Sequence, residues 1–260
     1  MSRSNYHDCR QLNLAREAEC PISYEELSPC KTNSISILSL GLDNTIYSIY
    51  HMKLEVAKQL YVDQGKTIDF KTQTPIKANM RGRIALQLKL AEYMLAGLSV
   101  DPTKEHLIAT FDAYLKNPAA TSEHDMVLMK TNLHMDDSGF LSEWIDTPVM
   151  NIRDLAIAKI ETSEPGSWLL RKASVVESDV IKPRCITFKN KMTGEVDHII
   201  IAHIYGFGYT TFDKMVRGYK MPFSNNGEKM PLFDTVYESF IDILESLTAY
   251  IDLAKIVHNS

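Results

Sequence analysis

The chain has 260 residues, of which 45% are hydrophobic and 23% charged. At about 100–200 residues per domain, this length indicates one or two domains with a sizeable core, and the composition excludes a largely disordered, collagen-like or coiled-coil chain. The 28 basic and 33 acidic residues leave a net charge of −5. No overall positive field therefore exists to hold a nucleic acid, and any bound anion must be met by a local site.

Cysteine is sparse, at positions 9, 20, 30 and 185. Four cysteines are too few for a disulfide scaffold, and they indicate a reducing, cytoplasmic compartment. The sequence contains no run of about 18 apolar residues, so we expect no membrane span. The first residues lack the apolar core of a secretory signal.

The N-terminal half alternates loops and amphipathic segments. Residues 20–30 (CPISYEELSPC) predict a turn, and the alternation in 35–40 predicts a short strand. Helical spacing predicts one helix from Tyr50 to about Gln64, stopped by Gly65, and a second over 81–96 that ends at Gly97. A third helix is expected to start at Asp101-Pro102 and to stop before Asn117-Pro118, followed by an irregular polar segment over 119–143.

The C-terminal half shows a different sequence pattern, in which strands are predicted between two helical segments. We expect a helix over 151–161, a turn leading into a strand at 163–174, and a hairpin over 183–212 with Thr193-Gly194 at its turn. A loop rich in glycine, proline, asparagine and methionine follows over 213–232, and apolar periodicity predicts one long helix over 233–257. The fold class is therefore α+β.

The segment Trp168-Leu-Leu-Arg171 follows Pro165-Gly166-Ser167 and precedes Ser174. It resembles the Phe-Leu-Val-Arg strand of Src-homology-2 domains. Further matches follow in order over residues 140–258: Trp144, Arg153, VDHIII with His198, FGYTTF, and FDTV followed by YESF. Taken alone, an arginine after an apolar triplet is more often a strand-edge charge or an ion-pair partner.

The resemblance implies a central antiparallel sheet flanked by two helices that binds phosphotyrosine through Arg171, Arg153, Ser174 and His198. An arginine grips phosphate with two parallel charge-assisted hydrogen bonds. Phosphotyrosine offers three acceptor oxygens, and its ring would lie against the stem of Arg153 and the imidazole of His198.

Two departures from the family pattern matter. Ile200 stands where many members carry a lysine, so Arg153 would supply the second cation. The 213–232 insertion replaces a short loop that selects residues after the phosphotyrosine. It would either clamp the peptide or remove ordinary sequence selection.

Cys20 and Cys30 invite a zinc hypothesis, but a closed tetrahedral set needs further ligands, and residues 65–80 contain no cysteine or histidine. We expect no metal and no cofactor. The segments CPISYEELSP, the helix ending at Tyr61 and Lys71-Thr-Gln-Thr-Pro-Ile76 instead resemble a U-box, a metal-free ubiquitin-ligase module, over residues 15–95.

The U-box resemblance implies that Ile22, Tyr61 and Pro75 form an apolar groove for a ubiquitin-conjugating enzyme. Gln73 stands where the family often places an arginine that locks the reactive pose. Such a ligase has no nucleophile of its own and acts by orienting its partner's thioester. The alternative is that Ile22, Tyr61 and Pro75 are ordinary core and turn residues.

These observations predict a U-box-like unit at 15–95, a helical connector at 96–139 and a Src-homology-2-like unit at 140–258. The expected function is a ubiquitin ligase for tyrosine-phosphorylated proteins. Two alternatives remain open: a non-catalytic phosphotyrosine-binding adaptor, and a structural protein that keeps the phosphate-binding residues without using them. The pairing resembles bacterial effectors, which implies delivery into a host cytosol.

Overall fold

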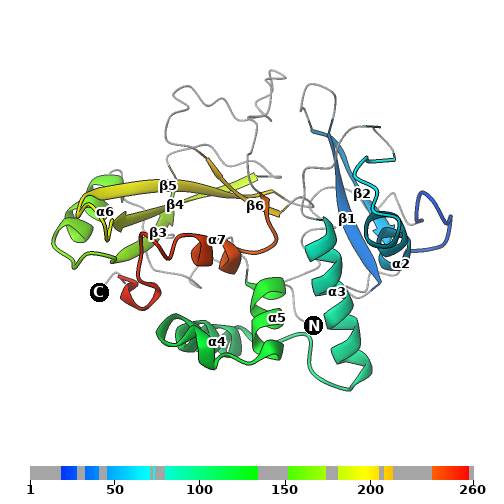
Figure 1. Ribbon diagram of the computed structural model, residues 1–260, viewed down its shortest axis with the longest axis horizontal. Coiled ribbons are helices and arrows are strands. Elements are labelled where there is room, and N and C mark those ends of the chain that lie inside the picture. The colour runs from blue at the N-terminus through cyan, green and yellow to red at the C-terminus, as the bar shows by residue number, and fades with distance from the viewer. Residues whose placement is uncertain are drawn as a thin grey trace.

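The computed structural model describes residues 19–27, 33–40, 46–70, 73, 80–133, 152–173, 181–204, 208–212 and 236–257. A two-stranded antiparallel hairpin and a five-stranded antiparallel sheet are joined by helices (Figure 1). This arrangement confirms the predicted α+β class. Within these ranges, no helix is long and apolar enough to cross a membrane.

The hairpin pairs β1 (Ser34–Leu40) with β2 (Ile46–Lys53), which confirms the predicted strand at 35–40. The prediction that a helix starts at Tyr50 is wrong, because Tyr50 pairs with Ile37 in the hairpin. The helical part begins with α2 (Leu54–Ala57) and continues as a π-helix, η2 (Lys58–Asp63). Cross-strand pairing thus outweighs the helical spacing of residues 50–53.

Three helices follow: α3 (Met80–Leu95), α4 (Lys104–Lys116) and α5 (Glu123–Asn132). The first confirms its prediction. Helix α4 begins later than predicted, because the hydroxyl of Thr103 rather than Asp101 accepts the N–H of His106, at 3.2 Å. Its end at Asn117 is as expected. A short 3-10 turn, η3 (Pro118–Ala120), separates α4 from α5.

Helix α5 lies inside the segment that we expected to be irregular, so that expectation is wrong. Its start is capped by Ser122, whose hydroxyl accepts the N–H of Asp125 at 3.0 Å. Three consecutive residues are buried, because Val127 and Leu128 pack toward α3 while Met129 enters the core of the large sheet. A helix with two buried sides lacks the single apolar stripe on which the sequence prediction relied.

The large sheet has the strand order β3-β4-β5-β6-β7, with every neighbouring pair antiparallel. Its strands are β3 (Trp168–Lys172), β4 (Ile181–Lys189), β5 (Val196–Ile204), β6 (Gly208–Phe212) and β7 (Val236–Tyr237). The predicted hairpin is confirmed. The side-chain oxygen of Asn190 accepts the N–H of Met192 at 2.9 Å and so closes its turn.

The two faces of this sheet are covered by different helices. On one face, Ala156 and Ile160 of α6 (Ile152–Glu161) pack against Leu169 of β3. On the other face, α4, α5 and α7 (Phe240–Ser246) share one core with the sheet. The sheet contributes to this core through Trp168, Leu170, Ile186, Phe188, Ile201 and Tyr209.

The prediction of one long helix over 233–257 is wrong. Helix α7 starts after Ser239, which forms a capping box with Asp242, and it ends at Leu247. The chain then runs beside β3 and includes a short 3-10 turn, η4 (Leu253–Lys255). The N–H of Val257 donates to the carbonyl of Trp168 at 2.8 Å, which covers the outer edge of the sheet. A continuous helix would leave that edge unpaired.

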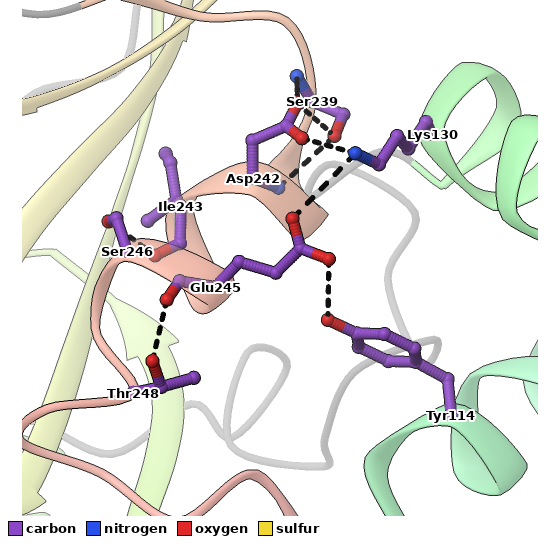
Figure 2. Close-up of polar contacts among 8 residues, drawn as sticks. All are labelled: Tyr114, Lys130, Ser239, Asp242, Ile243, Glu245, Ser246 and Thr248. Atoms are coloured by element: carbon purple, nitrogen blue, oxygen red, sulfur yellow. Dashed lines mark hydrogen bonds and ion pairs between the residues drawn. The ribbon is translucent and has the colours of Figure 1, made fainter. Parts of the chain in front are cut away.

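Helix α7 is held to α4 and α5 by polar contacts (Figure 2). Lys130 of α5 contacts Asp242 at 2.5 Å and Glu245 at 3.7 Å, and the hydroxyl of buried Tyr114 donates to Glu245 at 3.3 Å. Burial by itself lowers the pKa of Lys130, but the hydrogen bond and charge of Asp242, with Glu245 and Glu238, raise it overall.

We expect Lys130→Met to lower the free energy of unfolding by about 1–3 kcal/mol, because two carboxylates lose their cation in a half-buried site. Since the pKa of Lys130 lies above its ordinary 10.5, the contribution should persist below pH 10.5 and be lost as pH rises through the raised value. Urea unfolding measures both effects. Lys116→Met on the exposed end of α4 is the control, and equal losses for the two variants would contradict the assignment.

Candidate functional site

Three polar side chains form a connected row across β3, β4 and β5. Arg171 donates from Nε to the hydroxyl of Thr187 at 2.9 Å and from Nη1 to the carbonyl of Lys172 at 3.1 Å. The Thr187 hydroxyl lies 3.1 Å from Nδ1 of His198. The strand register explains the row, because Arg171 pairs with Cys185 and Thr187 pairs with His198. Paired residues share a face, and alternate positions along a strand return to it.

These four residues, Arg171, Cys185, Thr187 and His198, are called the Arg171 cluster below. Arg171 is 3% exposed and Thr187 is fully buried, whereas His198 is half-buried. The buried threonine hydroxyl therefore fixes the position of the guanidinium. The same hydroxyl links the guanidinium to an imidazole that reaches the surface.

The charge of Arg171 is not balanced by an acidic side chain in the described part of the chain. Burial lowers the pKa of Arg171; the neighbouring Cys185 raises it, and the charge of Arg153 lowers it again. No carboxylate of the described residues lies within ion-pair distance of its guanidinium. A buried cation without a counter-ion is costly, and an anion bound at its remaining N–H groups would relieve that cost.

Helix α6 carries a second arginine, Arg153, whose charge acts on the cluster. The Nζ of Lys189 donates to the carbonyls of Glu161 and Ser163, at 2.9 Å each, and so anchors the C-terminal end of the helix. Arg153 lies in the first turn, at the opposite end, and is exposed. Its charge reaches the cluster, since it lowers the pKa of both Arg171 and Cys185. The first turn of α6, which contains Arg153, is also the positive end of the helix dipole.

Cys185 and Thr187 were missed by the sequence reasoning. Both lie at alternate positions in the first strand of the predicted hairpin. Pairing this strand with β3 on one side and with β5 on the other would have placed them beside Arg171 and His198. Cys185 is 2% exposed, and burial raises the pKa of its thiol despite the opposing charge of Arg171. It is therefore a neutral, compact neighbour of the guanidinium.

The remaining phosphotyrosine-site prediction, Ser174, lies outside the described residues, as does Trp144. The structure thus connects Arg171 and His198 through Thr187, and it brings Arg153 within electrostatic reach of Arg171.

The residues predicted to bind a conjugating enzyme do not form a comparable row. Tyr61 is 2% exposed, inside the core beneath the β1–β2 hairpin, and Ile22 is half-buried against the same core. Gln73 is exposed at φ +58° and donates from its amide to the carbonyl of Phe70 at 2.6 Å. Pro75 lies outside the described residues. Their role stays a prediction.

Comparisons of the chain with protein-family models, curated proteins and solved structures found no match. In the segments that the structure describes, no three histidine, cysteine or acidic side chains are grouped so that they could hold a metal ion.

We expect Thr187→Val to lower the free energy of unfolding by about 1–3 kcal/mol, because it leaves the buried Nε–H of Arg171 and the Nδ1 atom of His198 without their hydrogen-bond partner. Thr187→Ser keeps the hydroxyl and loses only a methyl group, which should cost about 1 kcal/mol. Urea unfolding of the two variants tests the row. If valine is tolerated as well as serine, the hydroxyl does not position Arg171.

Proposed function

We propose that this protein binds phosphate monoesters at the Arg171 cluster, and that its ligand is a phosphotyrosine side chain of another protein. One observation carries the proposal. Arg171 is a buried, oriented guanidinium with no acidic partner among the described residues. A planar guanidinium with free N–H groups matches two oxygens of a phosphate, and burial strengthens such charge-assisted bonds.

The arrangement of elements supports this proposal. Helix α6 precedes β3, the antiparallel strands follow, and α7 covers the opposite face. This is the order that the resemblance of residues 140–258 to Src-homology-2 domains implies. The arginine lies near the end of β3 and the histidine on β5, as that resemblance expects.

The depth of the cluster favours tyrosine over serine or threonine as the phosphorylated residue. Arg171 is 3% exposed, so its phosphate must be presented at the end of a long side chain. The half-buried His198 and the exposed Arg153 offer the flat and aliphatic surfaces against which an aromatic ring packs. Phosphoserine is too short to bring its phosphate to the same depth.

A ubiquitin-conjugating enzyme as second partner remains a hypothesis from the N-terminal motifs alone. The ligase and the adaptor share the phosphotyrosine-binding step. In both cases the Arg171 cluster carries that step.

We expect Arg171→Lys to weaken phosphotyrosine-peptide binding at least about 100-fold, because two charge-assisted hydrogen bonds are worth about 1.5–3 kcal/mol each. Lysine keeps the charge but cannot form the planar fork. Fluorescence anisotropy with a degenerate phosphotyrosine peptide library measures the loss. Lys116→Ala, which removes a remote exposed cation, and the unphosphorylated library are the controls.

Circular dichroism of Arg171→Lys separates a folding defect from a binding defect. A folded variant with undiminished affinity would overturn the proposed site. Preference for phosphoserine peptides over phosphotyrosine peptides would overturn the proposed ligand class.

Arg153 should contribute to binding without contributing to folding. We expect Arg153→Ala to weaken phosphopeptide binding about tenfold and to reduce its dependence on salt, because one cation facing the phosphate is lost. The melting temperature should not change, since the side chain is exposed. Arg153→Lys should recover part of the affinity. Unchanged affinity and salt dependence in Arg153→Ala would remove Arg153 from the site.

A further inference from the structure

Helix α3 belongs to two hydrophobic cores at once. Near its start, Met80 and Ile84 are buried in the core of the β1–β2 hairpin, α2 and η2, which together with α3 we call the hairpin unit. Further along, Leu90 packs against Val127 and Leu128 of α5. Figure 1 shows α3 between the hairpin and α5. The direction of this helix therefore sets how the hairpin unit is oriented toward the large sheet.

The first turn of α3 also receives a side chain from the large sheet. Glu238 follows β7 directly and precedes Ser239, the N-cap of α7. A Cβ atom at Gly82 would overlap Oε1 and Cδ of Glu238. The carboxylate thus occupies the space that any other side chain at position 82 would fill.

The surroundings favour a carboxylate at this position. The first turn of a helix presents N–H groups that have no partner within the helix, together with the positive end of its dipole. On the other side, the charge of Glu238 helps to raise the pKa of Lys130, as do the charges of Asp242 and Glu245. Glu238 therefore lies between the start of α3 and the lysine that holds α7.

We propose that the close contact of the Glu238 carboxylate with Gly82, which we call the clasp, fixes the direction of α3 relative to the large sheet. The hairpin unit and the sheet then move as one body. The contacts with α5 alone, those of Leu90 and the ion pair of Lys89 with Glu123 at 3.6 Å, would leave α3 able to pivot. Gly82 and Tyr93, whose ring meets that of His124, are eleven residues and so about 16 Å apart along the helix. Contacts at both points fix the axis of α3. The clasp does not depend on which ligand the Arg171 cluster binds.

A double-mutant cycle on the full chain tests the clasp. Alanine is normally better than glycine inside a helix, so Gly82→Ala should stabilise the protein if nothing occupies its side-chain space. With the clasp present, Gly82→Ala should lower the melting temperature by at least about 2 °C. In a Glu238→Ala background, where the space is open, the same change should be neutral or raise it.

Hydrogen exchange then distinguishes a clasp from a local defect. Gly82→Ala should accelerate amide exchange both in residues 80–85 and in residues 236–242, because each segment holds the other. The proposal is overturned if Gly82→Ala raises the melting temperature equally in both backgrounds. It is also overturned if faster exchange is confined to α3.

Discussion

A guanidinium that is almost fully buried needs partners, and this requirement organises the large sheet. Arg171 donates hydrogen bonds from Nε to the hydroxyl of Thr187 and from Nη1 to the carbonyl of Lys172. Those bonds require β3 and β4 to pair in one register, and the link from Thr187 to His198 extends the requirement to β5. The remaining charge of Arg171 has no acidic partner among the described residues. The same constraint that orders three strands therefore holds a buried cation in a fixed orientation.

The elements around the sheet stabilise this arrangement from outside. The chain after α7 covers the open edge of β3 through the bond from Val257 to Trp168, so the strand that carries Arg171 has neighbours on both sides. Lys189 anchors the C-terminal end of α6, and the charge of Arg153 in the first turn of the same helix lowers the pKa of Arg171. On the far face, the contacts of Lys130 and Tyr114 hold α7 against α4 and α5. All four residues of the Arg171 cluster thus lie on paired strands of the large sheet.

Much of this architecture could be predicted from local sequence, and the failures have physical causes. Strands β3, β4 and β5 and helix α6 follow patterns of apolar residues, and Arg171 stands out near the end of β3, whereas β7 lies in the segment that was predicted as helix. Thr187 carries no local signal, because its role depends on which residues face each other across two strands. Apolar periodicity over 233–257 cannot indicate that the chain leaves the helix at Leu247 to bond with Trp168. The end of β2 was predicted as helix because only pairing with β1 across the hairpin shows that residues 50–53 are a strand. Helix α5 was missed because its buried residues pack toward two different cores.

The most direct test of the Arg171 cluster is an NMR titration of the full chain with phenyl phosphate, which follows the arginine Nε–H resonances. The signal missing from Arg171→Lys identifies Arg171. Because Nε is held by Thr187 in a buried site, its resonance should be visible and sharp before ligand is added. We predict that it shifts in a saturable way with phenyl phosphate, together with the imidazole resonances of His198. Saturable binding that leaves both resonances unchanged would contradict the account.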